Sequence, residues 1–343
     1  MTEIIDRLLK NQDLTDEEYL KLINEDFDLE YLQAAADKVR QKHYGKKVFL
    51  RGLIEISNYC KNDCFYCGIR CSNKAAERYR LNKEDILSCC EAGYELGFRT
   101  FVMQGGEDAY YTDDVMCDII SEIRKRYPDC AITLSLGERS FESYKKMFDA
   151  GANRYLLRHE TASDEHYNKL HPERMSLSDR KECLFNLKKI GFQTGSGFMV
   201  GSPYQTAEYI LEDIRFLQEL KPEMIGIGPY ITHKDTPFSM FKSGDVKLSL
   251  KLLSILRLMF PKALLPATTA LGTAAEDGRE KGLKAGANVI MPNLSPKDIR
   301  KLYNLYDNKL STGAESAENL KLLEERVKRA GYEIVYERGD AIK

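Results

Sequence analysis

Three successive segments decide the fold: V-F-L-R-G-L-I-E-I at residues 48–56, K-E-D-I-L-S-C-C-E-A-G-Y-E-L-G at 83–97 and T-F-V-M-Q at 100–104. The first and third are short apolar runs, as in buried strands, and the middle one is long enough for an amphipathic helix. A strand, a helix and a second strand in this order predict a right-handed βαβ unit with parallel strands.

The same alternation continues along the chain. Further strands are predicted at 131–136, 154–158, 193–200, 224–230, 263–269 and 288–292, and further helices at 113–127, 140–150, 176–190, 206–220, 247–260, 277–285 and 297–306. Together with the first unit this makes eight strands, each followed by a helix. The chain therefore predicts an α/β fold, a complete (β/α)₈ TIM-type barrel.

Two further segments flank the predicted barrel. We expect an N-terminal helical leader over residues 1–45, the barrel over 46–306, and a C-terminal extension of one helix and a short strand over 307–343. Within the leader, Thr15 and Glu18 have the spacing of a capping box, which predicts a helix start at that point.

The composition excludes several classes of protein. The chain of 343 residues is 43% hydrophobic and 30% charged, with a formal net charge of −2, so it has no field that would attract nucleic acid. Its first apolar residues, from Ile4 to Leu9, follow a helical spacing instead of a continuous apolar run. These features predict a cytoplasmic protein without a membrane segment.

Four of the nine cysteines crowd into residues 60–71, directly after the first predicted strand. Cys60, Cys64 and Cys67 follow a Cys-x₃-Cys-x₂-Cys pattern at the strand end where barrel enzymes hold their active sites. Three thiolates can bind three irons of a [4Fe–4S] cluster and leave the fourth iron open for an exogenous ligand. The sequence therefore predicts these three residues as metal ligands.

Other interpretations of the cysteines remain open at this point. A structural zinc site also tolerates closely spaced cysteines, although its usual form is two separated Cys-x₂-Cys pairs. Cys71 as a fourth ligand would close the cluster and make the chain an electron carrier or scaffold. We interpret Cys71 as a bystander, because the spacing begins with x₃ and Ser72 follows it where a ferredoxin has proline.

The cysteine pattern, with Tyr66 before its last member, resembles the signature of the radical S-adenosylmethionine superfamily. This resemblance implies one [4Fe–4S] cluster and S-adenosylmethionine as cosubstrate, which is cleaved reductively to methionine and a 5′-deoxyadenosyl radical. It also implies a reductant such as ferredoxin or flavodoxin and a small-molecule substrate. The chain is thereby predicted to be an enzyme.

Longer blocks narrow the resemblance to the HydE family of [FeFe]-hydrogenase maturases. They extend to about residue 306 and lie at 104–111, 155–162, 226–237, 266–273 and 286–293. HydE enzymes act on an iron–carbonyl–cyanide–cysteine precursor alongside the maturases HydG and HydF, which are implied as partners. Many members carry a second cluster near the C-terminus, but residues 307–343 contain no cysteine, so one cluster is expected.

A second family is also similar. Methylornithine synthase, which rearranges lysine, resembles this chain in its leader helices and in R-L-M-F-P at 257–261. Biotin synthase fits less well, because no second set of cluster ligands is evident.

The superfamily resemblance assigns roles around the cosubstrate. Glu107 closes a Gly-Gly-Glu segment that receives the amino group, Glu160 accepts ribose hydroxyls and Arg180 pairs with the methionyl carboxylate. For Glu160 and Arg180 the alternative is a surface salt bridge. The full predicted cosubstrate set is Tyr66, Gly105, Gly106, Glu107, Ser135, Glu160 and Arg180.

Polar residues on inward-facing strand positions predict the substrate site, because barrel interiors are otherwise filled with branched apolar side chains. Arg158 and His159 alternate sides of one strand, and the resemblance favours Arg158 facing an anionic substrate group while His159 packs. The predicted substrate-binding set is Gln104, Thr133, Arg158, Thr268, Thr269 and Tyr303, and no catalytic residue is assigned.

Overall fold

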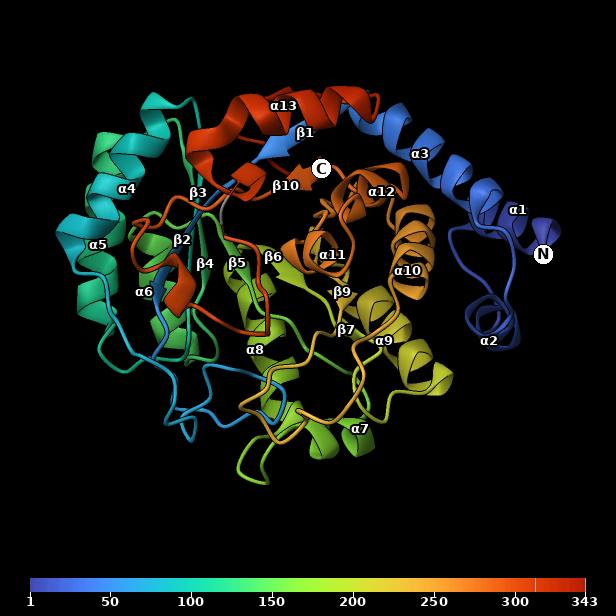
Figure 1. Ribbon diagram of the computed structural model, residues 1–343, viewed down its shortest axis with the longest axis horizontal. Helices are drawn as coiled ribbons and strands as arrows, with labels where there is room; N and C mark the ends of the chain where they lie inside the picture. Colours follow the sequence, from blue (N-terminus) through green and yellow to red (C-terminus); the bar gives the residue numbers. More distant parts are fainter. Residues whose placement is uncertain (312, 343) are drawn as a thin grey trace.

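Parallel strands surrounded by helices form the centre of the computed structural model, which describes residues 1–311 and 313–342 (Figure 1). The strands are β1 (Lys47–Leu50), β2 (Gly52–Ser57), β3 (Thr100–Gly105), β4 (Ala131–Ser135), β5 (Arg154–Leu156), β6 (Gln193–Ser196), β7 (Met199–Val200), β8 (Met224–Ile225), β9 (Gly228–Pro229), β10 (Val289–Ile290) and β11 (Glu333–Val335).

The strands close into a ring. One sheet has the order β2-β3-β4-β5-β6-β8, and all of its neighbours are parallel. Parallel bridges from Met224 to Leu264 and from Pro266 to Val289 continue it, and β10 pairs with β1. The last strand thus meets the first, and the predicted (β/α)₈ barrel is confirmed.

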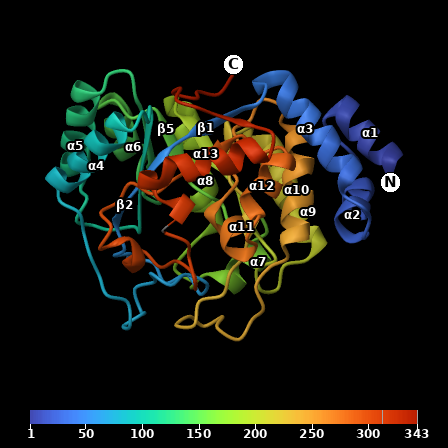
Figure 2. The ribbon, with the colours of Figure 1, turned by 45° about the horizontal axis from the view of Figure 1, so that its top comes forward.

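Helices cover the outside of this ring (Figure 2). Those between the barrel strands are α4 (Lys83–Glu95), α5 (Asp113–Arg126), α6 (Phe141–Asp149), α7 (Asp164–Leu170), α8 (Leu177–Ile190), α9 (Ala207–Leu220), α10 (Val246–Met259), α11 (Thr269–Ala274) and α12 (Gly278–Lys284). The chain begins with α1 (Thr2–Asn11), α2 (Asp16–Asn24) and α3 (Glu30–Tyr44), which pack on α9, α10 and α12. Near its end lie α13 (Leu320–Arg329) and β11.

Local signals at helix ends act as the sequence predicts. Thr15 and Glu18 form a reciprocal capping box at the start of α2. The four glycines that follow predicted helices, Gly97, Gly151, Gly191 and Gly286, all have φ between 93° and 119°. Only glycine adopts this backbone conformation without strain, so each ends its helix and turns the chain toward the next strand.

Several predicted elements differ in the structure. The eighth helix, predicted over 297–306, is wrong: the chain makes only a 3₁₀ turn at Arg300–Leu302, because tertiary contacts outweigh the helical pattern, and the Leu302 and Leu305 carbonyls accept from Asn58 and Gly68. The seventh strand, predicted over 263–269, is reduced to single bridges at Leu264 and Pro266, since proline cannot donate to a ladder. Strands five and six each break at a glycine into two short pieces.

The C-terminal segment crosses the amino-terminal end of the barrel. Strand β11 adds to β1 in parallel, and the chain then passes beneath the ring. There Arg154, fully buried, donates to the Arg338 carbonyl at 2.8 Å and to Asp340 at 2.7 Å, while Gln193 donates to Asp340 at 2.8 Å. These contacts close this end of the barrel interior with polar groups.

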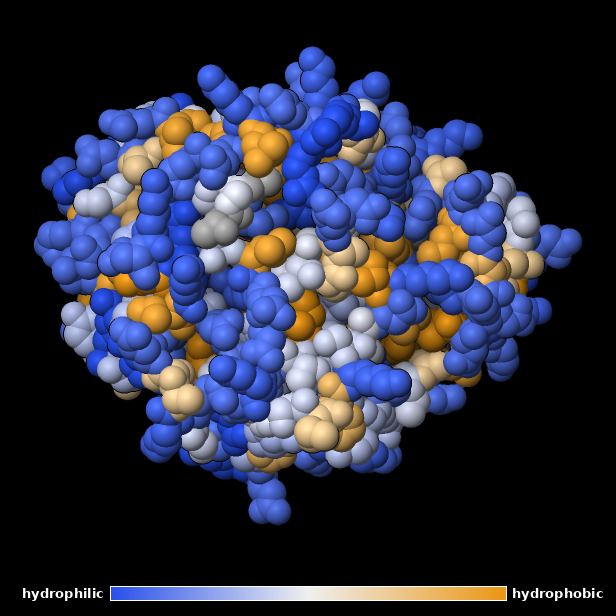
Figure 3. Space-filling model, in the orientation of Figure 1, coloured by the Kyte–Doolittle hydropathy of each residue, from blue (hydrophilic) through white to orange (hydrophobic). Residues whose placement is uncertain are grey.

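Hydrophilic side chains cover most of the face in Figure 3, with apolar side chains in small separate groups between them. Within residues 1–311 and 313–342, none of the helices combines the length and apolar character that crossing a membrane requires.

Candidate functional site

The cysteine loop leaves the carboxyl end of β2 and runs to α4, as predicted. Cys60, Cys64 and Cys67 are all free and partly exposed. Internal contacts shape the loop: Asp63 accepts two hydrogen bonds from Arg70, at 2.7 and 2.6 Å, and one from the backbone of Ser72 at 3.0 Å. The loop is therefore built around one partly buried ion pair, without regular secondary structure.

The end of β3 presses directly against this loop. The backbone N–H groups of Asn62 and Glu107 both point to the Cys60 sulfur, at 3.4 Å, and Lys61 donates to the Glu107 carbonyl at 2.9 Å. A Cβ atom at Gly106 would lie 2.2 Å from the Tyr59 carbonyl oxygen and 2.7 Å from the Cys60 Cβ. Only glycine allows this approach, which explains why the predicted Gly-Gly-Glu segment has glycine at position 106.

Burial keeps the three thiols protonated in the metal-free chain. It raises the pKa of Cys67 to about 12, and it raises the pKa values of Cys60 and Cys64 as well. Metal binding must therefore displace their protons. Among the described residues, no three metal-binding side chains converge on a single point, whereas a cubane takes one thiolate at each of three irons.

Cys71 lies beside the loop on its exposed side. Its backbone donates to the Asn62 carbonyl at 2.9 Å, and its sulfur lies 3.8 Å from the Arg174 guanidinium, which also donates to the Lys61 carbonyl. The Cys71 sulfur therefore has a partner within the protein.

The Tyr66 hydroxyl forms a hydrogen bond with His171, the residue that follows α7. The His171 ring stacks on Tyr167 and its Nδ1 lies 3.0 Å from the Tyr167 carbonyl, which can only accept. His171 Nε2 is therefore the acceptor for the Tyr66 hydroxyl at 3.1 Å. Burial, with the nearby Arg180 charge, lowers the pKa of His171 to about 3, in agreement with a neutral ring.

Glu107 and Arg180 meet near the mouth of the barrel, together with Glu138. Arg180 Nε lies 3.0 Å from Glu138 and its Nη1 lies 3.9 Å from Glu107, both without the alignment of a hydrogen bond. Glu138 was not predicted, because it lies in the loop after β4 with no motif around it.

Buried polar atoms without a hydrogen-bond partner among the described residues gather in this region. Each costs about 1–3 kcal/mol when left unsatisfied, and a bound polar molecule would relieve that cost. In the part of the chain that the structure describes, the atoms without any partner are Arg158 Nε, Tyr167 Oη and Thr133 Oγ1. Glu107 Oε2, Glu138 Oε1 and Arg180 Nε form no aligned hydrogen bond either, but they lie in ion pairs, Glu107 with Lys61 at 3.1 Å and Arg180 with Glu138 at 3.0 Å.

Glu160 adopts a strained backbone conformation four residues beyond the end of β5. Its φ of 66° is uncommon for a residue with a side chain, and hydrogen bonds with Gly197 and Met199 hold it. Its carboxylate accepts from Arg158 at 2.6 Å. His159 points the other way, fully buried between Ser196 and Asp213, so its predicted packing is observed, while the substrate contact of Arg158 stays a prediction.

The barrel interior carries a polar layer. Strand register places Glu55 beside Gln104 and Gln104 beside Ser135, so the three side chains share the inner face. Gln104 Nε2 lies 3.3 Å from the hydroxyl of Tyr303, which is buried. Thr133 lies one layer deeper, 2% exposed.

Thr268 and Thr269 lie at the start of α11 and already have partners. The Thr268 hydroxyl accepts from the Leu271 backbone at 3.4 Å as the helix cap, and Thr269 Oγ1 lies 3.3 Å from an Arg279 nitrogen. Their predicted substrate contact stays a prediction.

Three polar residues of the interior were missed from the sequence. Glu55 is fully buried and accepts from Asn293 at 2.8 Å and from Lys309 at 2.6 Å. Its alternation with Leu53 and Ser57 could have placed it on the inner face. Nothing in the sequence could have placed Lys309, because its position depends on an irregular segment.

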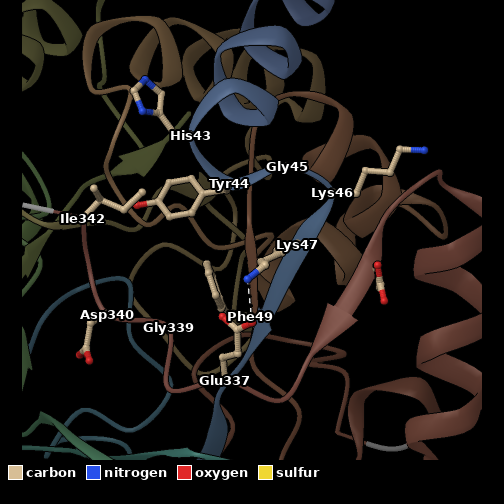
Figure 4. Close-up of a pocket in the computed structure, with 11 residues that line it drawn as sticks. His43, Tyr44, Gly45, Lys46, Lys47, Phe49, Glu337, Gly339, Asp340 and Ile342 are labelled. Atoms are coloured by element: carbon tan, nitrogen blue, oxygen red, sulfur yellow. Dashed lines mark hydrogen bonds and ion pairs between the residues drawn. The ribbon is translucent and has the colours of Figure 1, made fainter.

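Two pockets open at the opposite end of the barrel. One, of about 570 Å³, lies between the end of α3, β1 and the C-terminal segment, and Lys47 pairs with Glu337 inside it (Figure 4). The other, of about 630 Å³, lies between Lys42, Lys221 and Phe260. Neither contains a predicted site residue.

Comparisons with known proteins agree with this geometry. Residues 54–217 match the model of the radical SAM superfamily. The [FeFe] hydrogenase maturase subunit HydE of Thermotoga maritima is 47% identical over 82% of this chain and 80% of its own length. The 3-methylornithine synthase of Methanosarcina acetivorans is 31% identical over 87% of this chain and 86% of its own length.

Solved structures show the same architecture. The crystal structure of methylornithine synthase aligns with a TM-score of 0.86 at 29% identity, over 97% of both chains. That of HydG, a maturase of the [FeFe]-hydrogenase, aligns with a TM-score of 0.81 over 97% of this chain and 75% of its own, at 21% identity, which speaks for the fold alone.

Proposed function

This chain belongs to the radical S-adenosylmethionine superfamily and is an enzyme of that family, and we propose that it acts as a HydE-like maturase of [FeFe]-hydrogenase. Membership implies a [4Fe–4S] cluster and S-adenosylmethionine. The substrate that we propose is a small organometallic or amino-acid-derived molecule bound in the barrel.

One observation carries this proposal. Three free thiols stand in one loop at the carboxyl end of β2, next to a glycine that cannot be replaced without moving them, in a chain 47% identical to a HydE. We assign Cys60, Cys64 and Cys67 as the ligands of a single cluster. No cysteine occurs in residues 307–343, so the proposal contains no second cluster.

The cluster and S-adenosylmethionine, when bound, supply a 5′-deoxyadenosyl radical that abstracts hydrogen. The chain's own residues orient the cosubstrate and exclude water. Glu107 and Arg180 offer opposite charges at the end of β3 and the start of α8, fitting the amino and carboxylate groups. Glu160 is held by its strained backbone at a position that suits ribose hydroxyls.

The substrate would lie deeper, against the polar interior layer. We assign Gln104, Thr133 and Arg158 to it, with Tyr303 in the same interior and Thr268 and Thr269 at the start of α11. Thr133 has a buried hydroxyl with no hydrogen-bond partner among the described residues, so it supports this assignment most directly.

Partners and location belong to the same proposal. We expect a ferredoxin or flavodoxin as the reductant, HydF and HydG as maturation partners, and a cytoplasmic location. All nine cysteines are free, which suits a reducing compartment.

In vitro maturation tests the proposal. The reconstituted protein, added to apo-hydrogenase with HydF and HydG, is expected to restore hydrogen evolution in proportion to its concentration. A Cys64→Ala variant should restore none. If the wild-type protein cleaves S-adenosylmethionine but yields no active hydrogenase, the maturase assignment is wrong.

The second candidate is a methylornithine synthase-like mutase, favoured by the alignment over 97% of both chains. Incubation with L-lysine distinguishes the two functions, because only the mutase converts it to methylornithine.

A further inference from the structure

Glu55 is an acidic group in the wall of the proposed substrate cavity. It shares its layer with Gln104 and Ser135, and its side chain is fully buried. One carboxylate oxygen accepts from Asn293, three residues beyond the end of β10, at 2.8 Å. A buried carboxylate needs a positive partner, and the barrel strands supply none at its other oxygen.

The partner comes from outside the barrel. Lys309 Nζ lies 2.6 Å from the second oxygen of Glu55, and only 8% of its side chain is exposed. Its ammonium group also lies 5.4 Å from the centre of the Tyr303 ring. Lys309 therefore belongs to the same interior layer, although it follows the last barrel strand in the sequence.

Lys309 lies in an irregular segment, residues 303–310, which we call the strap. The Leu305 carbonyl accepts from Gly68 in the cysteine loop, at 2.9 Å, and the Asp307 backbone donates to the Thr232 carbonyl at 3.0 Å. The Leu310 backbone donates to Thr273 at 3.3 Å. The strap is thus tied to the loops after the first and sixth strands and to α11, at the carboxyl end of the barrel.

Glu55 and Lys309 together make this part of the interior wall neutral. Without Lys309, Glu55 would attract a substrate ammonium group and repel an anion. With Lys309 in place the carboxylate is occupied, and of the three N–H donors of the ammonium only one has a hydrogen-bond acceptor among the described residues. The remaining donors suit an anionic or acceptor group.

We propose that Lys309 is the internal counter-ion of Glu55, and that this pair selects an anionic substrate and rejects one that presents an ammonium group to the interior. Lys309 is a specificity-determining residue. This deepens the proposed function: in an iron–carbonyl–cyanide–cysteine complex, one cyanide, one thiolate and one carboxylate together outweigh the charge of ferrous iron, so the complex is an anion. L-lysine carries the opposite group on its side chain.

The test compares wild type, Lys309→Met, the double variant Lys309→Met/Glu55→Gln and the control Lys301→Met, which changes an exposed lysine. Bound iron and sulfide and the urea-unfolding midpoint are measured for all four, which controls for folding and cluster content. The first probe is a synthetic iron(II)–carbonyl–cyanide–cysteine complex, whose Michaelis constant is measured from the rate at which deoxyadenosine forms. The second is radiolabelled L-lysine, whose binding is measured by equilibrium dialysis.

Lys309→Met is expected to raise the Michaelis constant for the complex roughly 100-fold, because it leaves a buried carboxylate unpaired, and to bind lysine at least roughly tenfold more tightly. The double variant, neutral again, should recover to within about tenfold of wild type and lose the gain in lysine binding. An unchanged Michaelis constant and unchanged lysine binding in Lys309→Met would overturn the inference, as would a double variant no better than the single one.

Failure of the proposed function looks different. If the wild type does not turn over the complex at all, the maturase assignment fails, while the lysine arm still tests the charge selectivity of the pair.

Discussion

Gly106 is the residue on which the position of the cysteine loop depends most directly. Its missing side chain leaves room for the Tyr59 carbonyl and the Cys60 Cβ, both of which lie closer than 3 Å to where a Cβ would stand. Gly106→Ala is expected to push the loop outward, to lower stability by about 1–3 kcal/mol, and to reduce bound iron and sulfide after reconstitution.

Gly105→Ala is the matched control, because its nearest contact would be 3.3 Å from the Ser57 carbonyl. Iron analysis and urea unfolding should separate the two variants. Full cluster content in Gly106→Ala would contradict the role of this close approach.

Cys71 tests whether the cluster has three or four protein ligands. Its contact with Arg174 accounts for it without metal, so Cys71→Ala should retain iron, sulfide and 5′-deoxyadenosine formation. Cys64→Ala should lose all three. Loss of the cluster in both variants would instead support a closed, four-thiolate electron carrier.

At the scale of elements, α7 holds the cysteine loop through the His171–Tyr66 hydrogen bond. The pKa of His171 is lowered to about 3 by burial and the nearby Arg180, against 6.5 ordinarily, so between these values the unfolded chain binds the proton and the folded chain does not. Stability should therefore be full above pH 6.5 and fall as the pH drops toward 3.

Replacing this histidine should remove part of that dependence. In His171→Gln, the slope of unfolding free energy against pH between 6.5 and 4 should shrink by up to about 1.4 kcal/mol per pH unit, measured by urea unfolding of the metal-free chain. Lys301→Gln, at an exposed position, is the control. An unaltered slope in His171→Gln would show that the ring is already protonated in the fold.

The C-terminal segment closes the other end of the barrel. Asp340 is the acidic partner of Arg154, a fully buried cation. Asp340→Ala should therefore lower the free energy of unfolding by about 1–3 kcal/mol, a modest value because 40% of the Asp340 side chain is exposed. Chemical denaturation at pH 7 measures this difference.

Glu337→Ala is the comparison, since its pair with Lys47 is about half exposed on both sides and should change stability by less than about 0.5 kcal/mol. Equal effects of the two substitutions would contradict the larger contribution of Asp340 to the free energy of unfolding.

Elements differ in how far the sequence predicts them, and the difference has a physical cause. The strands around Val102, Leu134 and Tyr155 could be predicted because a parallel strand covered on both faces consists of a continuous run of apolar residues. The cysteine loop could be predicted because spacing alone defines a ligand set. The seventh strand is reduced to single bridges because it contains a proline. The predicted eighth helix is a 3₁₀ turn followed by the strap, because tertiary contacts outweigh local helix propensity there.

Lys309 is the clearest case of a site residue that the sequence could not predict. It lies 254 residues from Glu55 in sequence and on no regular element, so neither period nor motif could pair them. The predicted segment boundaries at 45 and 306 remain predictions, although the strap shows that residues beyond 306 contribute side chains to the barrel interior.

At the scale of the whole molecule, the two ends of the barrel have different roles. The carboxyl end carries the cysteine loop, the strained Glu160 and the polar layer, while the amino end is closed by Arg154, Gln193 and Asp340. A ring closed by parallel pairing over its full circumference gives these groups a rigid frame, which radical chemistry needs in order to exclude water.

Electron paramagnetic resonance of the reconstituted, dithionite-reduced protein, recorded with and without S-adenosylmethionine and followed by assay for 5′-deoxyadenosine, tests the central claim most directly. The predicted result is a [4Fe–4S] signal that shifts when the cosubstrate binds an open iron, together with formation of 5′-deoxyadenosine. An unshifted signal and no cleavage would contradict the account, because they would mean that no iron is open to the cosubstrate.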